Sequence, residues 1–154
     1  VLRVNTTSKE EFRFWLTRRF TQGLWPLLQK GLRANPDVVQ QSSAETRKAV
    51  LDFQQEAATQ KMDTARPFKE QPTNFPLGDE NILLTRAQMK VKKEGGYLLS
   101  MNSVDGKGVN FNLDNNVLHM LSKILVDILP KTGWSQPIPW QDPSGNAPTG
   151  KKLN

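Results

Sequence analysis

Residues 8–32 read SKEEFRFWLTRRFTQGLWPLLQKGL and concentrate aromatic, leucine and arginine side chains in one stretch. Their apolar residues recur at steps of three and four, the spacing that places side chains on one face of an α-helix. Ser8 and Glu11 have the spacing of a capping box, which marks a helix start. We therefore expect one helix over residues 8–32, and its apolar stripe is the expected centre of the core: Phe12, Trp15, Leu16, Phe20, Leu24, Leu27, Leu28 and Leu32.

A second face of this predicted helix carries Phe14, Arg18 and Trp25, which lie off the main stripe. One core need not cover this face. We therefore expect it to meet either another part of the chain or a partner.

Three residues inside the predicted helix affect its shape. Pro26 removes one backbone donor, but the apolar stripe resumes in phase after it, which predicts a kink rather than an end. Gly23 and Gly31 lie on the main stripe, where a missing side chain lets another backbone approach closely.

A second helix is predicted over residues 42–62, with Ser42 as its cap. A narrow apolar line predicts that it packs antiparallel on the first helix: Thr46, Val50, Phe53 and Ala57. Residues 63–81 contain three prolines and show no periodicity. Because they also carry aromatic residues, we expect an ordered strap across the core.

Three segments alternate apolar and polar side chains, as half-buried strands do: residues 83–92, 97–102 and 109–113. Glycine-containing turns separate them, which predicts a three-stranded antiparallel meander. A last helix, capped by Asp114 or Asn115, is expected to cover the sheet.

The predicted fold class is α+β. Its expected order is a short N-terminal strand, a two-helix hairpin, a three-stranded antiparallel meander, a C-terminal helix and an extended Pro/Gly-rich tail. We expect residues 1–134 to form a single α+β domain. Residues 135–154 are expected to be an extended tail or one held by a partner.

Composition excludes several classes of protein. The chain has 154 residues and no cysteine, which excludes disulfides, thiolate metal sites and cysteine nucleophiles. No apolar run approaches the roughly 20 residues of a membrane-spanning helix, so we expect a soluble, cytoplasmic protein without a membrane partner. The net charge of +6 and the pI of about 9.7 favour an acidic partner such as nucleic acid, although such charge also serves solubility.

No motif in the sequence specifies a chemistry. His119 is the only histidine and is interpreted as structural or merely exposed, because it borders the apolar stripe of the last predicted helix. A phosphate-binding loop is followed by a helix, whereas no predicted helix directly follows the glycine pairs. We therefore predict no catalytic, cofactor-binding or metal-ligating residue, and a protein that is not an enzyme.

Two binding functions remain. The first is a non-catalytic binding or assembly module that contacts a protein partner or another copy of itself through helix 8–32 and the C-terminal tail, with these contact residues: Phe14, Arg18, Trp25 and Trp140. The alternative is nucleic-acid binding through basic faces of that helix and of the sheet: Arg13, Arg18, Arg19, Arg86, Lys90 and Lys92. The polar face of the predicted sheet has no aromatic residue for base stacking, which counts against this alternative.

Overall fold

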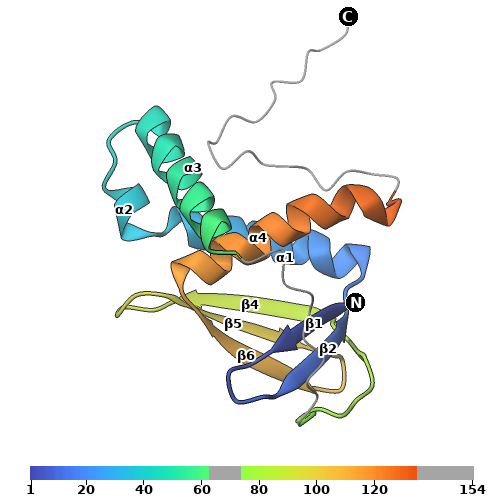
Figure 1. The fold of residues 1–154 in the computed structure, drawn as a ribbon. Coiled ribbons are helices and arrows are strands. Elements are labelled where there is room, and N and C mark those ends of the chain that lie inside the picture. The colour runs from blue at the N-terminus through green and yellow to red at the C-terminus, as the bar shows by residue number, and fades with distance from the viewer. Residues whose placement is uncertain (63–73, 135–154) are drawn as a thin grey trace, which may run out of the picture.

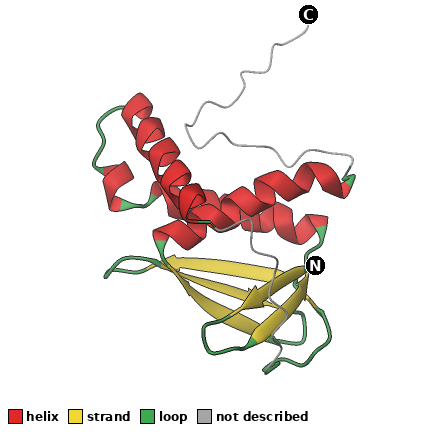
Figure 2. Ribbon diagram, viewed as in Figure 1, coloured by secondary structure: helices red, strands yellow, loops and turns green. Residues whose placement is uncertain are grey.

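The helices lie on one side of the molecule and the strands on the other (Figure 1, Figure 2). The computed structural model describes residues 1–62 and 74–134, and it confirms the α+β class. The predicted tail, residues 135–154, and most of the predicted strap lie outside the described residues. The described elements are, in chain order, β1 (Leu2–Asn5), β2 (Glu11–Trp15), α1 (Arg18–Arg33), α2 (Pro36–Val39), α3 (Ala44–Lys61), β3 (Ile82–Leu83), β4 (Arg86–Val91), β5 (Tyr97–Asn102), β6 (Gly108–Leu113), α4 (Asn115–Ile128) and the 3-10 helix η1 (Leu129–Thr132).

The described strands form two three-stranded sheets, in the orders β1-β2-β3 and β4-β5-β6. β1 and β2 are antiparallel, and β2 and β3 are parallel, with Trp15 opposite Leu83. The second sheet is the predicted antiparallel meander, which is confirmed. No helix among the described residues is both long and apolar enough to cross a membrane.

The prediction of one helix over residues 8–32 is wrong in its first half. Glu11–Trp15 form strand β2, and α1 begins only at Arg18, where the Thr17 hydroxyl accepts a hydrogen bond from the Phe20 N–H at 3.1 Å. The aromatic residues of this stretch fit helical steps of three and four, but they also alternate along a strand. Pairing with β1 favours the strand. Ser8 and Glu11 therefore do not form the predicted helix cap.

The second half of the prediction is confirmed, because α1 continues through Pro26 without ending. Gly31 provides a close approach, but of side chains and not of the expected backbone: a Cβ atom there would lie 2.5 Å from Met89 Cε and 3.0 Å from Leu118 Cδ2. Gly23 does not, since a Cβ atom there would meet nothing within 4 Å. α1 therefore packs closely on Met89 of β4 and Leu118 of α4 at Gly31, near its C-terminal end.

The second predicted helix exists as α3, but its cap and its partner differ from the prediction. Ser43, one residue beyond Ser42, forms the capping box with Thr46. The helix packs mainly against α4 rather than α1, and its inward-facing residues are Leu51 and Ala58. Phe53, which was expected to face inward, is 71% exposed. The short helix α2 was not predicted, because Pro36 seemed only to end the preceding segment.

The single strand predicted over residues 83–92 is broken into β3 and β4. Leu84 is buried at the break, and its N–H donates to the Trp15 carbonyl oxygen at 3.2 Å. The next N–H, that of Thr85, donates to the Asn102 carbonyl oxygen at 2.9 Å. The chain therefore passes from the first sheet to the second at this point, and Leu83 faces outward instead of inward.

The last helix is α4, and Asp114 caps it as predicted, because its Oδ1 accepts from the Val117 N–H at 2.8 Å. Its buried residues are Leu118, His119, Ser122 and Leu125. The core lies between α1, α4 and the inner faces of both sheets. Phe12 joins the two sheets there, since its ring stacks on Phe14 and meets Phe111 edge-on, with centroids 5.8 Å apart.

We predict opposite effects of two glycine substitutions in α1. Gly31→Val should lower the free energy of unfolding by about 2 kcal/mol, because Met89 and Leu118 leave no room for the new side chain. Gly23→Ala should raise it by about 0.5 to 1 kcal/mol, because its site is open and alanine favours a helix. Urea unfolding at pH 7 measures both values, and equal stability of Gly31→Val and wild type would contradict this packing.

Candidate functional site

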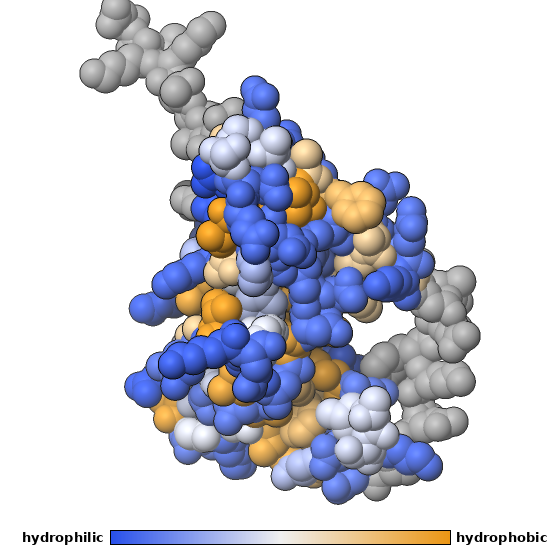
Figure 3. Space-filling view, turned by 90° about the vertical axis from the view of Figure 1, so that its left-hand side faces the viewer, coloured by the Kyte–Doolittle hydropathy of each residue, from blue (hydrophilic) through white to orange (hydrophobic). Residues whose placement is uncertain are grey.

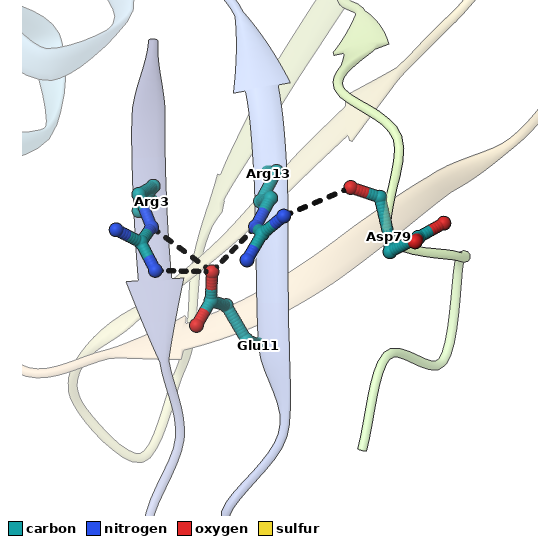
Figure 4. Close-up of polar contacts among 4 residues, drawn as sticks. All are labelled: Arg3, Glu11, Arg13 and Asp79. Carbon is teal, nitrogen blue, oxygen red and sulfur yellow. Dashed lines mark hydrogen bonds and ion pairs between the residues drawn. The ribbon is translucent and has the colours of Figure 1, made fainter. Parts of the chain in front are cut away.

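A buried carboxylate holds the first sheet together (Figure 4). Glu11 Oε1 accepts from Arg3 Nε at 2.9 Å and from Arg13 Nε at 2.6 Å, so it links β1 to β2. The second nitrogen of the same arginine, Arg13 Nη1, donates to the Asp79 carbonyl oxygen at 3.1 Å. Its guanidinium group also lies 4.8 Å from the centre of the Phe75 ring. Arg13 therefore fastens the segment that precedes β3 to the outer face of β2.

The ionised form of Glu11 is favoured by these contacts. The hydrogen bond from Arg13, together with that from Arg3 and the charge of both groups, lowers the pKa of the Glu11 carboxyl although burial opposes the shift. Arg13 was predicted to bind nucleic acid. Its contacts with Glu11, Asp79 and Phe75 give it a structural role, and its binding to nucleic acid stays a prediction.

Two of the predicted protein-contact residues are not at the surface. Phe14 and Trp25 belong to the buried core, so of the two alternatives expected for this face, contact with another part of the chain holds for them. Phe14 is buried because it alternates with outward-facing residues of a strand, and not because it lies on a helix. Arg18 is partly buried in the first turn of α1. Trp140 lies outside the described residues.

An apolar surface that could not be predicted from the sequence lies at the corner where the chain changes sheets. Trp15 and Leu83 are each 50% exposed and lie opposite each other in neighbouring strands. Val104, in the turn between β5 and β6, is 84% exposed. Two hollows of about 470 and 520 Å³ share Leu83, Thr85 and Val104 in their linings. We call these adjoining hollows the corner groove.

The two hollows of the corner groove carry different charges. The first lies between the N-terminal end of α1 and the start of β4, and Arg19 and Arg86 line it together. The second lies beside the segment that precedes β3, and it is lined by one lysine and three acidic residues: Lys107, Asp79, Glu80 and Asp105. The groove is thus cationic at one end, apolar in the middle and mainly anionic at the other end.

A second surface is the outer face of the β4-β5-β6 sheet. Strand register places its residues in three rows, each of which crosses all three strands. The rows define what we call the polar sheet face: Arg86, Asn102 and Gly108; Gln88, Ser100 and Asn110; Lys90, Leu98 and Asn112. None of these nine residues is acidic, and none is buried.

The structure separates the residues predicted to bind nucleic acid. Arg86 and Lys90 are exposed on the polar sheet face, and Arg19 is exposed across the first hollow from Arg86. Lys92 is partly buried in the turn after β4. The register of the meander therefore brings together only part of the predicted set.

His119 has the structural position that was expected of it. It is buried between α4 and α3, with Nδ1 3.0 Å from Gln55 Oε1 and Nε2 3.3 Å from Gln54 Oε1. Burial lowers the pKa of its imidazole, which favours the neutral ring. Within residues 1–62 and 74–134, no three His, Cys, Asp or Glu side chains are grouped so that they could hold a metal ion.

In comparisons with known proteins, no family model, curated protein or solved structure matches this chain. Its function therefore has to be inferred from the corner groove and the polar sheet face.

We predict that Glu11→Gln lowers the free energy of unfolding by about 2 kcal/mol at pH 7, because charge-assisted hydrogen bonds to two arginines are lost. The pKa of Glu11 is lower in the folded chain than its usual value of 4.5. Its contribution is therefore complete above that value and disappears as the pH falls through the folded pKa.

Urea unfolding of wild type and Glu11→Gln between pH 7 and pH 3 tests this prediction. The difference between their stabilities should shrink below pH 4.5. A difference that stays constant over this range would contradict the assigned role of the carboxylate.

Proposed function

We propose that this chain is a non-catalytic assembly module in which the corner groove of one copy binds the C-terminal segment, residues 135–154, of another copy. The observation that carries this proposal is the gathering of exposed apolar side chains around one groove. Leu83 and Val104 line the groove and are at least half exposed, and Trp15, also half exposed, lies opposite Leu83 in the neighbouring strand. Contiguous apolar surface of this kind is typical of contact sites.

The first hollow supports the binding of an apolar side chain. Its lining includes the buried side chains of Phe20 and Leu84 as well as the exposed ones of Leu83 and Val104. A tryptophan inserted into such a hollow is among the most effective anchors of protein contacts, because it removes a large apolar area from water.

The sequence of the C-terminal segment offers a matching set of side chains. Ile138 and Trp140 alternate with prolines, which restrict the backbone and reduce the conformational entropy lost on binding. Asp142 follows, and Lys151 and Lys152 come near the end of the chain. The segment is thus apolar first, then anionic, then cationic.

The two charged parts of the segment complement the charges at the two ends of the groove. With Trp140 in the first hollow, Asp142 would lie near Arg19 and Arg86, the two arginines of that hollow. The two lysines would then reach the second hollow, whose lining is mainly acidic. Opposite charges placed in this order fix the direction of a bound segment and disfavour other partners.

The described part of the chain ends near the first hollow of the groove. In Figure 1, α4 and α1 run in opposite directions, and they pack against each other. The end of α4 therefore lies at the N-terminal end of α1, where the first hollow begins. Trp134 packs on the core, and Trp140 lies six residues beyond it, a reach of up to roughly 20 Å. Two copies that meet at this end can exchange segments reciprocally as a closed two-fold dimer.

Light scattering of the full chain at increasing concentration tests the proposal. We expect the mass to double, and the variants Trp140→Ala and Leu83→Asp each to weaken the dimer by about 2 kcal/mol, roughly 30-fold in Kd. Val39→Asp is the matched control, because Val39 is exposed on α2 and does not line the groove. This control should dimerise as wild type does.

Mixing the two impaired variants gives a sharper result. Trp140→Ala retains its groove and Leu83→Asp retains its C-terminal segment, so a one-to-one mixture should form dimers more strongly than either variant alone. A wild type that stays monomeric at all concentrations, or a mixture that behaves like the separate variants, contradicts the exchange of segments.

A further inference from the structure

We infer that the polar sheet face is a separate binding site, which takes the phosphate backbone of a nucleic-acid duplex. This site lies outside the assembly contact, apart from Arg86, which also lines the first hollow of the corner groove. Its ligand class follows from three properties of the nine residues on this face: their charge, their amide groups and the absence of aromatic rings.

The charge of the face has one sign. Arg86 and Lys90 stand in the first and last of its three rows, on one strand and four residues apart, a separation of about 13 Å along the strand. Both side chains are exposed, and no acidic residue lies in any of the rows. Solvated faces of antiparallel sheets usually mix both signs of charge. A face with cations alone attracts phosphates.

The amide groups fill the space between and beside these cations. Gln88 and Asn110 occupy the two ends of the middle row, and Asn102 and Asn112 belong to the outer rows. Amide N–H groups donate to phosphate oxygens, and such contacts account for much of the hydrogen bonding in protein–DNA complexes. The face therefore offers donors to phosphates across all three strands.

The face also indicates which form of nucleic acid it takes. Among its nine residues there is no aromatic ring on which an unpaired base could stack, because Tyr97 and Phe111 point to the core side of the sheet. Contacts with phosphates alone do not require unstacked bases. A duplex, whose two strands present a denser array of phosphates, is therefore the favoured ligand over a single strand.

Fluorescence anisotropy of a labelled 20-base-pair DNA duplex, titrated with the full chain at 20 to 200 mM NaCl, tests this inference. We expect binding that weakens with salt, with a slope of log K against log salt of about −2. An RNA duplex should bind comparably, and a single strand of the same sequence should bind at least 3-fold more weakly.

The diagnostic variant is Gln88→Glu combined with Asn110→Asp. It puts two acids in the middle row without changing side-chain size or touching the residues that line the corner groove. We expect duplex affinity to fall at least 10-fold at 20 mM NaCl, while dimerisation stays as in wild type. Lys90→Gln should weaken binding about 3-fold to 10-fold and reduce the salt slope by about 1.

The matched control is Gln40→Glu combined with Gln60→Glu, which changes the net charge by the same amount at exposed positions on the helical side. Its duplex affinity should stay within 2-fold of wild type. Absence of binding at 20 mM NaCl would overturn the inference. So would an equal loss of affinity in the control and the diagnostic variant, because binding would then reflect net charge and not this face.

Discussion

The carboxylate of Glu11 accepts hydrogen bonds from arginines on two neighbouring strands, and one of these arginines also binds the segment before β3. Removing a carboxylate from water is costly unless it is paired. Burial of Glu11 therefore requires the pairing of β1 with β2, and Arg13 links this pair to the returning segment. After this segment, β3 pairs in parallel with β2, and the chain crosses to the second sheet at Leu84 and Thr85.

This crossing accounts for both surfaces to which we assign a function. Leu84 turns into the core at the crossing, so Leu83 before it faces outward beside Trp15 and the corner groove becomes apolar. After the crossing, the alternation of β4 places Arg86 and Lys90 outward while α1 covers the inner face of the sheet at Met89. The left-hand side of the molecule is mostly hydrophilic, with hydrophobic side chains in several groups, over the helices as well as over the strands (Figure 3).

The meander, α4 and its Asp114 cap could be predicted because alternation, glycine turns and capping are local signals. The segment Glu11–Trp15 could not be assigned correctly, because its aromatic residues fit both a helical and a strand period. Phe14 was therefore placed on a surface instead of in the core. The corner groove could not be predicted either. It depends on pairing between β2 and β3, which are far apart in the sequence. It also depends on a change at Leu84 in which side chains face inward, and the regular alternation of the sequence does not predict this change.

Photo-cross-linking tests most directly whether the corner groove holds the C-terminal segment of a second copy. Leu83 is replaced by a photoreactive benzoylphenylalanine in ¹⁵N-labelled chain, which is mixed with unlabelled wild type, and the cross-linked peptides are identified by mass spectrometry. We predict products that join position 83 of the labelled chain to residues 137–142 of the unlabelled chain. Products that join position 83 only to its own chain, or to segments of the second copy other than 135–154, would contradict this account.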